Sequence, residues 1–199
     1  MKNWKFFMVL ILPVAFLNCD ELKEALEEEV EVTTSYTHRL SFSVLPDSEP
    51  AQQFETFINV GSFDLLANPD VTNLIGNPER IKEIEILGVR YELKNFIGNV
   101  DANIDNPLFY LATESPGGPP DLVFLGTNAN IAEADFFGTL FTVSGNFNGA
   151  SQRLNQSSRK IFDYVISGIV DYVPATFDIE TTFTFRLKLE IDPDEFAVE

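Results

Sequence analysis

The chain has 199 residues and a formal net charge of −18, with 31 acidic residues, 13 basic residues, one cysteine and one histidine. A chain this acidic is repelled by polyanions, so nucleic acid is excluded as a partner. One cysteine and one histidine cannot build an internal disulfide or a zinc site, and we expect no cofactor.

The first 18 residues have the layout of a secretory signal peptide. Lys2 and Lys5 precede an apolar stretch over residues 6–17, and Cys19 follows shortly after it. A membrane-spanning helix needs about 20 apolar residues in a row, and this stretch is too short. We therefore interpret residues 1–18 as a signal peptide.

Cys19 stands between this apolar stretch and a run of acids. A lone cysteine in an exported protein is an idle thiol, an intermolecular bridge or a modified residue. The motif "AFLNC" resembles the lipobox of bacterial lipoproteins. The resemblance implies acylation of Cys19, a palmitate-type membrane anchor, and a location in the cell envelope at the outer membrane. An ordinary signal peptide with an incidental cysteine is the alternative.

We expect residues 19–29 to form a lipidated acidic tether. The sequence "DELKEALEEEVE" carries a single lysine among seven acids, and such a block repels itself and stays solvated. Acids directly after a lipidated cysteine resemble the surface-export signal of Bacteroidota-type lipoproteins. A plain spacer is one alternative, and inner-membrane retention through Asp20 is another. Without residues 1–18 the chain keeps 31 acidic and 11 basic residues, a net charge of about −20.

Residues 30–199 are predicted to form a single all-β domain, an antiparallel β-sandwich with one or two short helical turns. Apolar and polar residues alternate from Val30 to Val44 and again from Phe177 to Ile191, as expected of strands with one buried face. The strands predicted between them lie near Phe54–Val60, Ile81–Leu87, Val89–Phe96, Leu108–Thr113, Leu122–Leu125, Phe136–Val143 and Tyr164–Tyr172.

Several local signals interrupt these strands. Gly88 stands where the apolar parity switches, which predicts a bulge or bend. The sequence Asn-Pro-acid at 68–70 and 77–79 predicts two short helical turns over one end of the sandwich. Residues 114–121 read as an exposed hairpin tip, and residues 144–160 as a long polar connection with one helical turn around 152–156.

His38 is the one candidate for histidine chemistry. It lies on the inward parity of the first strand, so we interpret it as a packed or interfacial side chain. Paired carboxylates for a hydrolase carry little weight, because 31 acids always offer some plausible pair. The sequence therefore assigns no catalytic residue.

A weak calcium candidate lies in "DANIDN". Asp101, Asn103 and Asp105 occupy alternate positions, as in the first half of an EF-hand loop. The motif departs from that loop, because Asn106 stands where glycine is needed and Ala112 where glutamate is needed. We favour an Asx-rich turn here, with no metal.

The distribution of charge gives one candidate partner site. Residues 136–162 contain no acid, and Arg153, Arg159 and Lys160 fall within them. This basic island is either a contact for an acidic partner or headgroup, or a solvated loop that happens to lack acids.

The leading functional hypothesis is a non-catalytic envelope lipoprotein whose β-sandwich binds another protein or an envelope component, as an accessory subunit of an outer-membrane assembly. A carrier of an apolar or lipid ligand is the second hypothesis, because 19 phenylalanines must be buried or presented to something. A hydrolase that uses two carboxylates is the third.

Overall fold

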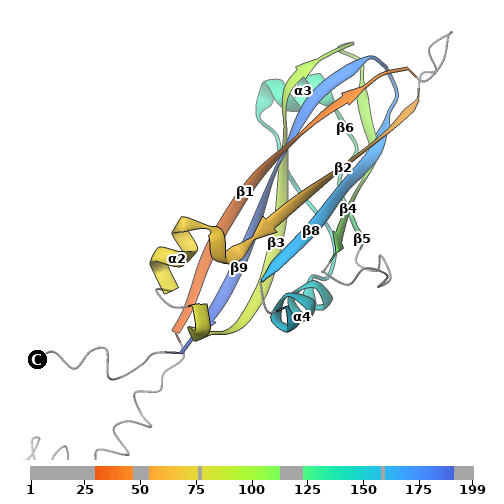
Figure 1. Cartoon of the computed structure of the whole chain (residues 1–199). Coiled ribbons are helices and arrows are strands. Elements are labelled where there is room, and N and C mark those ends of the chain that lie inside the picture. Colours follow the sequence, from red (N-terminus) through yellow and green to blue (C-terminus); the bar gives the residue numbers. More distant parts are fainter. Residues whose placement is uncertain (1–29, 47–53, 76–77, 113–122, 158–159, 191–199) are drawn as a thin grey trace, which may run out of the picture.

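The structure, a computed structural model, describes residues 30–46, 54–75, 78–112, 123–157 and 160–190 (Figure 1). Two antiparallel sheets pack face to face and confirm the predicted β-sandwich. Sheet A has the strand order β1-β9-β3-β7, and sheet B the order β2-β8-β4-β5, with β6 paired to β4. The strands are β1 Val30–Val44, β2 Glu55–Asp64, β3 Ile81–Ile97, β4 Asn103–Ala112, β5 Val123–Leu125, β6 Ala129–Asn130, β7 Leu140–Thr142, β8 Ile161–Val170 and β9 Ala175–Leu189.

The path of the chain between the sheets is that of a jelly roll. The chain crosses from one sheet to the other at nearly every connection, and the hairpin from β4 to β5 stays within sheet B. The first and last strands, β1 and β9, pair along their whole length, with Val30 opposite Leu189 and Val44 opposite Ala175. Apart from the two-residue strand β6, each sheet has four strands, and two four-stranded sheets connected in this way are the jelly-roll arrangement.

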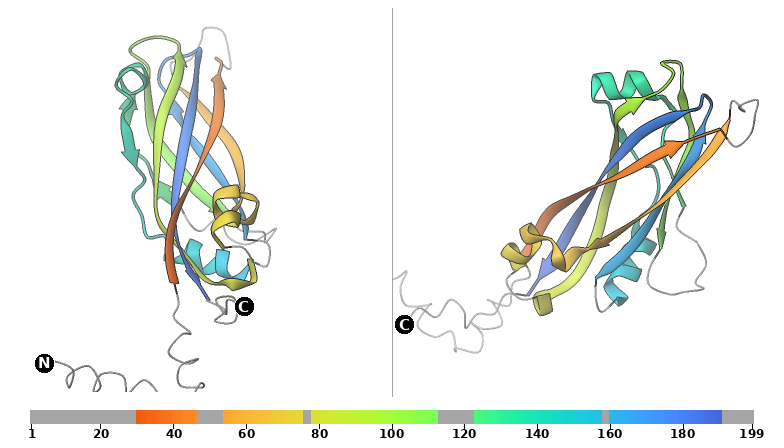
Figure 2. Two further views of the ribbon diagram at one scale, coloured as in Figure 1. Left: turned by 90° about the vertical axis from the view of Figure 1, so that its left-hand side faces the viewer. Right: turned by 45° about the horizontal axis from the view of Figure 1, so that its top comes forward.

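Short helices cover the two ends of the sandwich. Near the start of β1 lie η2 (Leu65–Ala67), α2 (Pro69–Ile75), η3 (Pro78–Arg80) and α4 (Asn148–Gln156), whereas α3 (Ile131–Phe137) lies at the opposite end (Figure 2). The placement of α2 and η3 fits the two helical turns predicted over one end. In the described part of the chain, no helix is long and apolar enough to cross a membrane.

Aromatic rings from both sheets fill the space between them. Phe57 of β2 packs edge-on against Phe177 of β9, with ring centroids 5.4 Å apart, and Phe63 stacks on Phe185 at 5.2 Å. Tyr91 packs between two further rings. Burying one large apolar side chain stabilises the fold by about 1.5–3 kcal/mol, so this ring-packed interior is the main source of stability.

Side-chain amides cap the exposed strand edges. Asn155 of α4 accepts a hydrogen bond from Ile84 N at 2.7 Å and donates one to Ile84 O at 2.9 Å, as a neighbouring strand would. Asn59 of β2 donates to Ser41 O of β1 at 3.0 Å, and its oxygen accepts from Val60 N at 2.8 Å. These contacts satisfy backbone groups that would otherwise be open to another chain.

The predicted strands are confirmed at both ends of the domain, and the bulge at Gly88 is confirmed as well. The two segments predicted on either side of Gly88 form one long strand, β3, whose register with β9 shifts between Ile86 and Gly88. The predicted hairpin tip at 114–121 lies outside the described residues.

The strand predicted from Phe136 to Val143 is wrong. Residues 131–137 form α3, and the strand that follows is limited to Leu140–Thr142. The Asn130 side chain caps the helix by accepting from Glu133 N, and Gly138 ends it in the left-handed conformation. Adjacent phenylalanines favour a strand, but these two end signals and the burial of one helical face prevail.

Other boundaries also differ from the prediction. The helix α4 runs over nine residues, where one turn was expected. The strand β2 continues to Asp64, whose carboxylate then caps η2 by accepting from Leu66 N and Ala67 N. The strand β4 begins at Asn103, five residues before the predicted start, because a register shift between Asp105 and Leu108 lets pairing continue past Pro107.

The interior predicts opposite outcomes for two glycine substitutions. A Cβ on Gly61 would lie 2.4 Å from Cζ of the buried Tyr164 ring, whereas one on Gly88 would have no atom within 4 Å. We expect Gly61→Ala to lower the free energy of unfolding by about 1–3 kcal/mol through overpacking. Gly88→Ala should not lower the free energy of unfolding. Urea denaturation measures both, and equal effects would contradict the described packing around Tyr164.

Candidate functional site

The outer face of sheet A is a charged surface whose side chains pair across strands. Four of its basic residues meet carboxylates on neighbouring strands: Arg39 and Lys94 with Glu180, Arg186 with Glu85 and Glu31, and Lys188 with Glu83. Hydroxyls continue the pattern, with 2.9 Å between Thr37 Oγ1 and Thr182 Oγ1. This face balances its own charges and presents a polar surface to water.

Glu180 is the centre of the charged network. Its carboxylate accepts a hydrogen bond from Lys94 Nζ at 2.7 Å and another from Arg39 Nε at 3.1 Å. These two bonds, that from Lys94 first, lower the pKa of Glu180. Burial raises the pKa of the nearby Asp178, but hydrogen bonds from neighbouring side chains outweigh burial and the net shift is downward. Both groups stay ionised, which is the opposite of what a general acid needs.

The outer face of sheet B carries mostly apolar side chains across four strands, with Ser167 among them. The register aligns its outward side chains in two rows, Val60–Val165–Tyr110 and Ile58–Ser167–Leu108–Leu125. Ile58 is 72% exposed, Val60 58% and Leu125 59%, so the face is most open to solvent along β2 and β5, the first and last strands in the order of sheet B. We call these seven residues the apolar stripe.

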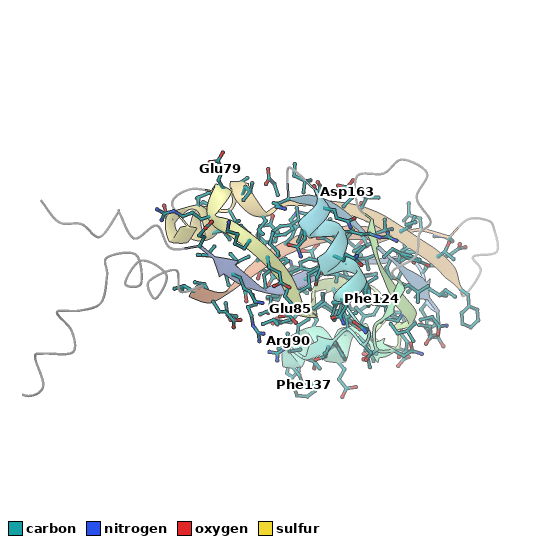
Figure 3. The ribbon with its side chains drawn as sticks, turned by 90° about the horizontal axis from the view of Figure 1, so that it is seen from below. Glu79, Glu85, Arg90, Phe124, Phe137 and Asp163 are labelled. Atoms are coloured by element: carbon teal, nitrogen blue, oxygen red, sulfur yellow. The ribbon has the colours of Figure 1, made fainter. Side chains whose placement is uncertain are left out.

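Carboxylates border the apolar stripe on both sides. Asp163 lies one row beyond Val165 along β8, and Asp105 pairs with Ile169 in the row beyond Ser167. No lysine or arginine occurs in β2, β4, β5 or β8. Figure 3 shows Asp163 of sheet B and Arg90 of sheet A on opposite sides of the sandwich. Sheet B is therefore an apolar surface with an acidic border, unlike the balanced face of sheet A.

His38 is half-buried and lies on the inward parity of β1, as the strand pattern predicts. Its Nδ1 lies 2.6 Å from the hydroxyl of Tyr164, which is buried. Burial, with a smaller contribution from Tyr36, raises the pKa of Tyr164. The hydroxyl therefore keeps its proton and is suited to donate to the ring nitrogen. The pair links β1 to β8 within the core.

The weak calcium candidate is part of the end of sheet B. Asn103 N donates to Asp171 Oδ1 at 2.6 Å, and Asn103 Nδ2 donates to Asp171 Oδ2 at 2.8 Å and to Asp101 O at 2.8 Å. Asp105 lies two residues after Asn103 in the same strand, β4, on the outer face. The described residues contain no group of three or more His, Cys, Asp or Glu side chains that could hold a metal ion. The Asn103 amide joins β4 to the residue after β8.

The basic island is divided by the structure. Arg153 lies on α4, whereas Arg159 lies outside the described residues. Lys160 Nζ donates to Asn155 O at 2.8 Å, at the C-terminal end of α4, and burial lowers its pKa. A cation in this position stabilises the helix terminus, so Lys160 has a role within the fold. Cys19 likewise lies outside the described residues.

The tip of α3 carries a second apolar group. Phe136 is 83% exposed and Phe137 68% exposed, with ring centroids 5.0 Å apart. Phe137 lies at the outer side of α3 in Figure 3. The sequence places both rings in a strand, where one would be buried, and so misses their exposure. The apolar stripe was also missed in the sequence. The signal that could have indicated it is the pair Ile58 and Val60, two apolar residues at outward positions of β2.

Comparison with known proteins does not assign the chain to a family. No protein-family model matches the chain, and no curated protein matches it. The solved structures that it resembles include the decameric BFDV capsid protein, at 10% identity and a TM-score of 0.44, covering 79% of this chain and 99% of that one. They also include the 60-mer form of that protein (12%, 0.38, 82% and 96%) and Desmodium yellow mottle tymovirus (9%, 0.33, 83% and 91%). Likeness at this level carries no argument about function.

The charged network predicts a pH-dependent contribution to stability. Because the pKa of Glu180 is lowered in the folded chain, its contribution is present above the ordinary value of 4.5 and is lost as the pH falls below that value. We expect Glu180→Gln to destabilise by about 0.5–1 kcal/mol at pH 7, and this difference from the unsubstituted chain should shrink below pH 4.5. Asp163→Asn on sheet B is the control. A difference that is constant from pH 7 to pH 3 in thermal unfolding would refute the network.

Proposed function

We propose that this chain is a non-catalytic cell-envelope lipoprotein, anchored through Cys19, whose jelly-roll domain is a binding module in an outer-membrane assembly. The observation that carries the binding role is the apolar stripe on sheet B. Exposed apolar patches of this kind mark interaction sites in soluble domains. The lipobox-like motif at the start of the chain supports the membrane location.

The contrast between the two outer faces favours contact through sheet B. On sheet A, most outward positions hold hydroxyls and charges, many of them paired, and the exposed apolar residues Leu140 and Ile97 lie at β7 and at the end of β3. On sheet B, the same outward positions hold Ile58, Val60 and Leu125, each more than half exposed. Burying one such side chain against a partner is favourable by up to about 1.5–3 kcal/mol relative to leaving it in water. A partner that covers the stripe recovers this free energy.

The interior gives less support to a carrier of apolar ligands. Such a carrier needs an apolar cavity, whereas rings of both sheets meet between the layers, as with Phe42 and Phe57 at 5.0 Å. A groove of about 400 Å³ lies along the edges of β1 and β2 and is lined by residues 41–45 and 55–59. It lies at the margin of the sandwich. Core packing in the described part of the chain thus accounts for nine of the 19 phenylalanines without an apolar ligand.

The anchor predicts covalent lipid on Cys19. In a bacterial host grown with an alkyne-labelled palmitate analogue, we expect the chain to carry the label and to sediment with membranes. Cys19→Ser should lose both properties, because one thiol supplies the attachment point. An unlabelled wild-type chain recovered from the culture medium would refute the anchor.

The binding role predicts a partner at sheet B in the native envelope. We expect the photocrosslinker p-benzoylphenylalanine to give a discrete adduct when it replaces Ile58, because that position lies in the apolar stripe. At Thr33, exposed on the outer face of sheet A, the same crosslinker should give none. Adducts at neither position, or equal adducts at both, would refute a binding module that uses sheet B.

A further inference from the structure

The dimensions of the apolar stripe limit what can cover it. The stripe crosses four strands, which spans about 14 Å at the usual strand spacing. It is two rows wide, with Val60 and Val165 in one row and Ile58 and Leu108 in the other. A helix of about 10 residues has this length, and the apolar face of an amphipathic helix has a comparable width.

The acidic border lies at a spacing that suits flanking cations. Asp163 and the row of Asp105 and Ile169 are separated by six residues along β8, which is about 20 Å in an extended strand. A helix with side chains is about 10–12 Å across. Lysine or arginine stems on both flanks of its apolar face would extend outward to Asp163 on one side and Asp105 on the other.

The negative charge at the border of the stripe distinguishes among the molecules that could bind there. A second copy of the chain would bring the same acidic border against itself, and the chain already carries a net charge of −18. An anionic bilayer surface would meet like charge in the same way. A surface with an apolar centre and a cationic border is complementary to both parts of sheet B.

We propose that sheet B binds a basic amphipathic helix of a partner protein, with the apolar face of the helix on the stripe and its lysines or arginines beside Asp105 and Asp163. This inference rests on the proposed binding role and names the chemistry of the partner. An adduct at Ile58 without helix binding would leave the binding role standing and refute the helix.

Three synthetic 14-residue peptides test this directly by titration. The first contains leucine and lysine at helical spacing, the second leucine and glutamate at helical spacing, and the third leucine and lysine in strict alternation, which favours a strand. The full chain in phosphatidylcholine nanodiscs is the receptor, and empty nanodiscs are the reference. We expect the helical leucine–lysine peptide to bind at least tenfold more tightly than either of the others.

Two pairs of variants separate a site from general attraction to an acidic chain. Ile58→Ser with Val60→Ser keeps the net charge, and we expect it to weaken the helical leucine–lysine peptide at least tenfold. Asp105→Asn with Asp163→Asn should reduce the salt dependence of binding. Glu83→Gln with Glu85→Gln, which removes the same charge from sheet A, should leave that dependence nearly unchanged. Circular dichroism confirms that each variant is folded.

Several results would overturn the proposal. Equal affinity for the two leucine–lysine peptides would show that helical spacing is not recognised. Binding that survives the serine pair, or that falls equally with both acid pairs, would indicate attraction to net charge alone. A dimer in ultracentrifugation that the serine pair dissolves would assign the stripe to a second copy, and serine-sensitive binding to anionic vesicles would assign it to a bilayer.

Discussion

The alternation of side chains along each strand is the constraint from which the rest of the structure follows. One parity of every long strand enters the space between the sheets, where rings pack in pairs such as Phe57–Phe177, Phe63–Phe185 and Tyr91–Phe109. Because the core fixes the inward parity and the register, the outward parity of each sheet is free to take its own chemistry. A shift of one residue in β2 would bury Ile58 and Val60 and expose Phe57 and Phe63.

The two sheets use this freedom in opposite ways. Sheet A holds paired charges and hydroxyls, and the cations of β1, β3 and β9 are balanced there by carboxylates such as Glu180 and Glu85. Sheet B has carboxylates and no cations in its strands. Side-chain amides bind backbone groups at the strand edges of both sheets. Asn155 pairs with the backbone of Ile84 in β3, and Asn59 of β2 donates to Ser41 O of β1. These contacts leave fewer backbone groups at the strand edges open to pairing with another chain.

The sequence predicts the sandwich well because a period of two is a strong signal in strands with one buried face. It fails where two local signals compete, as at 131–137, where the Asn130 cap and Gly138 produce a helix although Phe136 and Phe137 resemble a strand. The candidate site was hidden for a different reason. Ile58, Val165 and Leu108 are far apart in the chain, and their alignment depends on cross-strand register, which the sequence does not reveal. The basic island, by contrast, is visible in the sequence, but the fold engages Lys160 at the end of α4.

The central claim is that the outer face of sheet B, and not that of sheet A, is covered in the native envelope. Carbene footprinting of the full chain, in intact cells and after purification, tests this directly. The account predicts that peptides from β2, β4 and β8 lose labelling in cells relative to the purified chain, while those from β1 and β9 are labelled alike in both. Equal labelling of β2, β4 and β8 in the two states would contradict it.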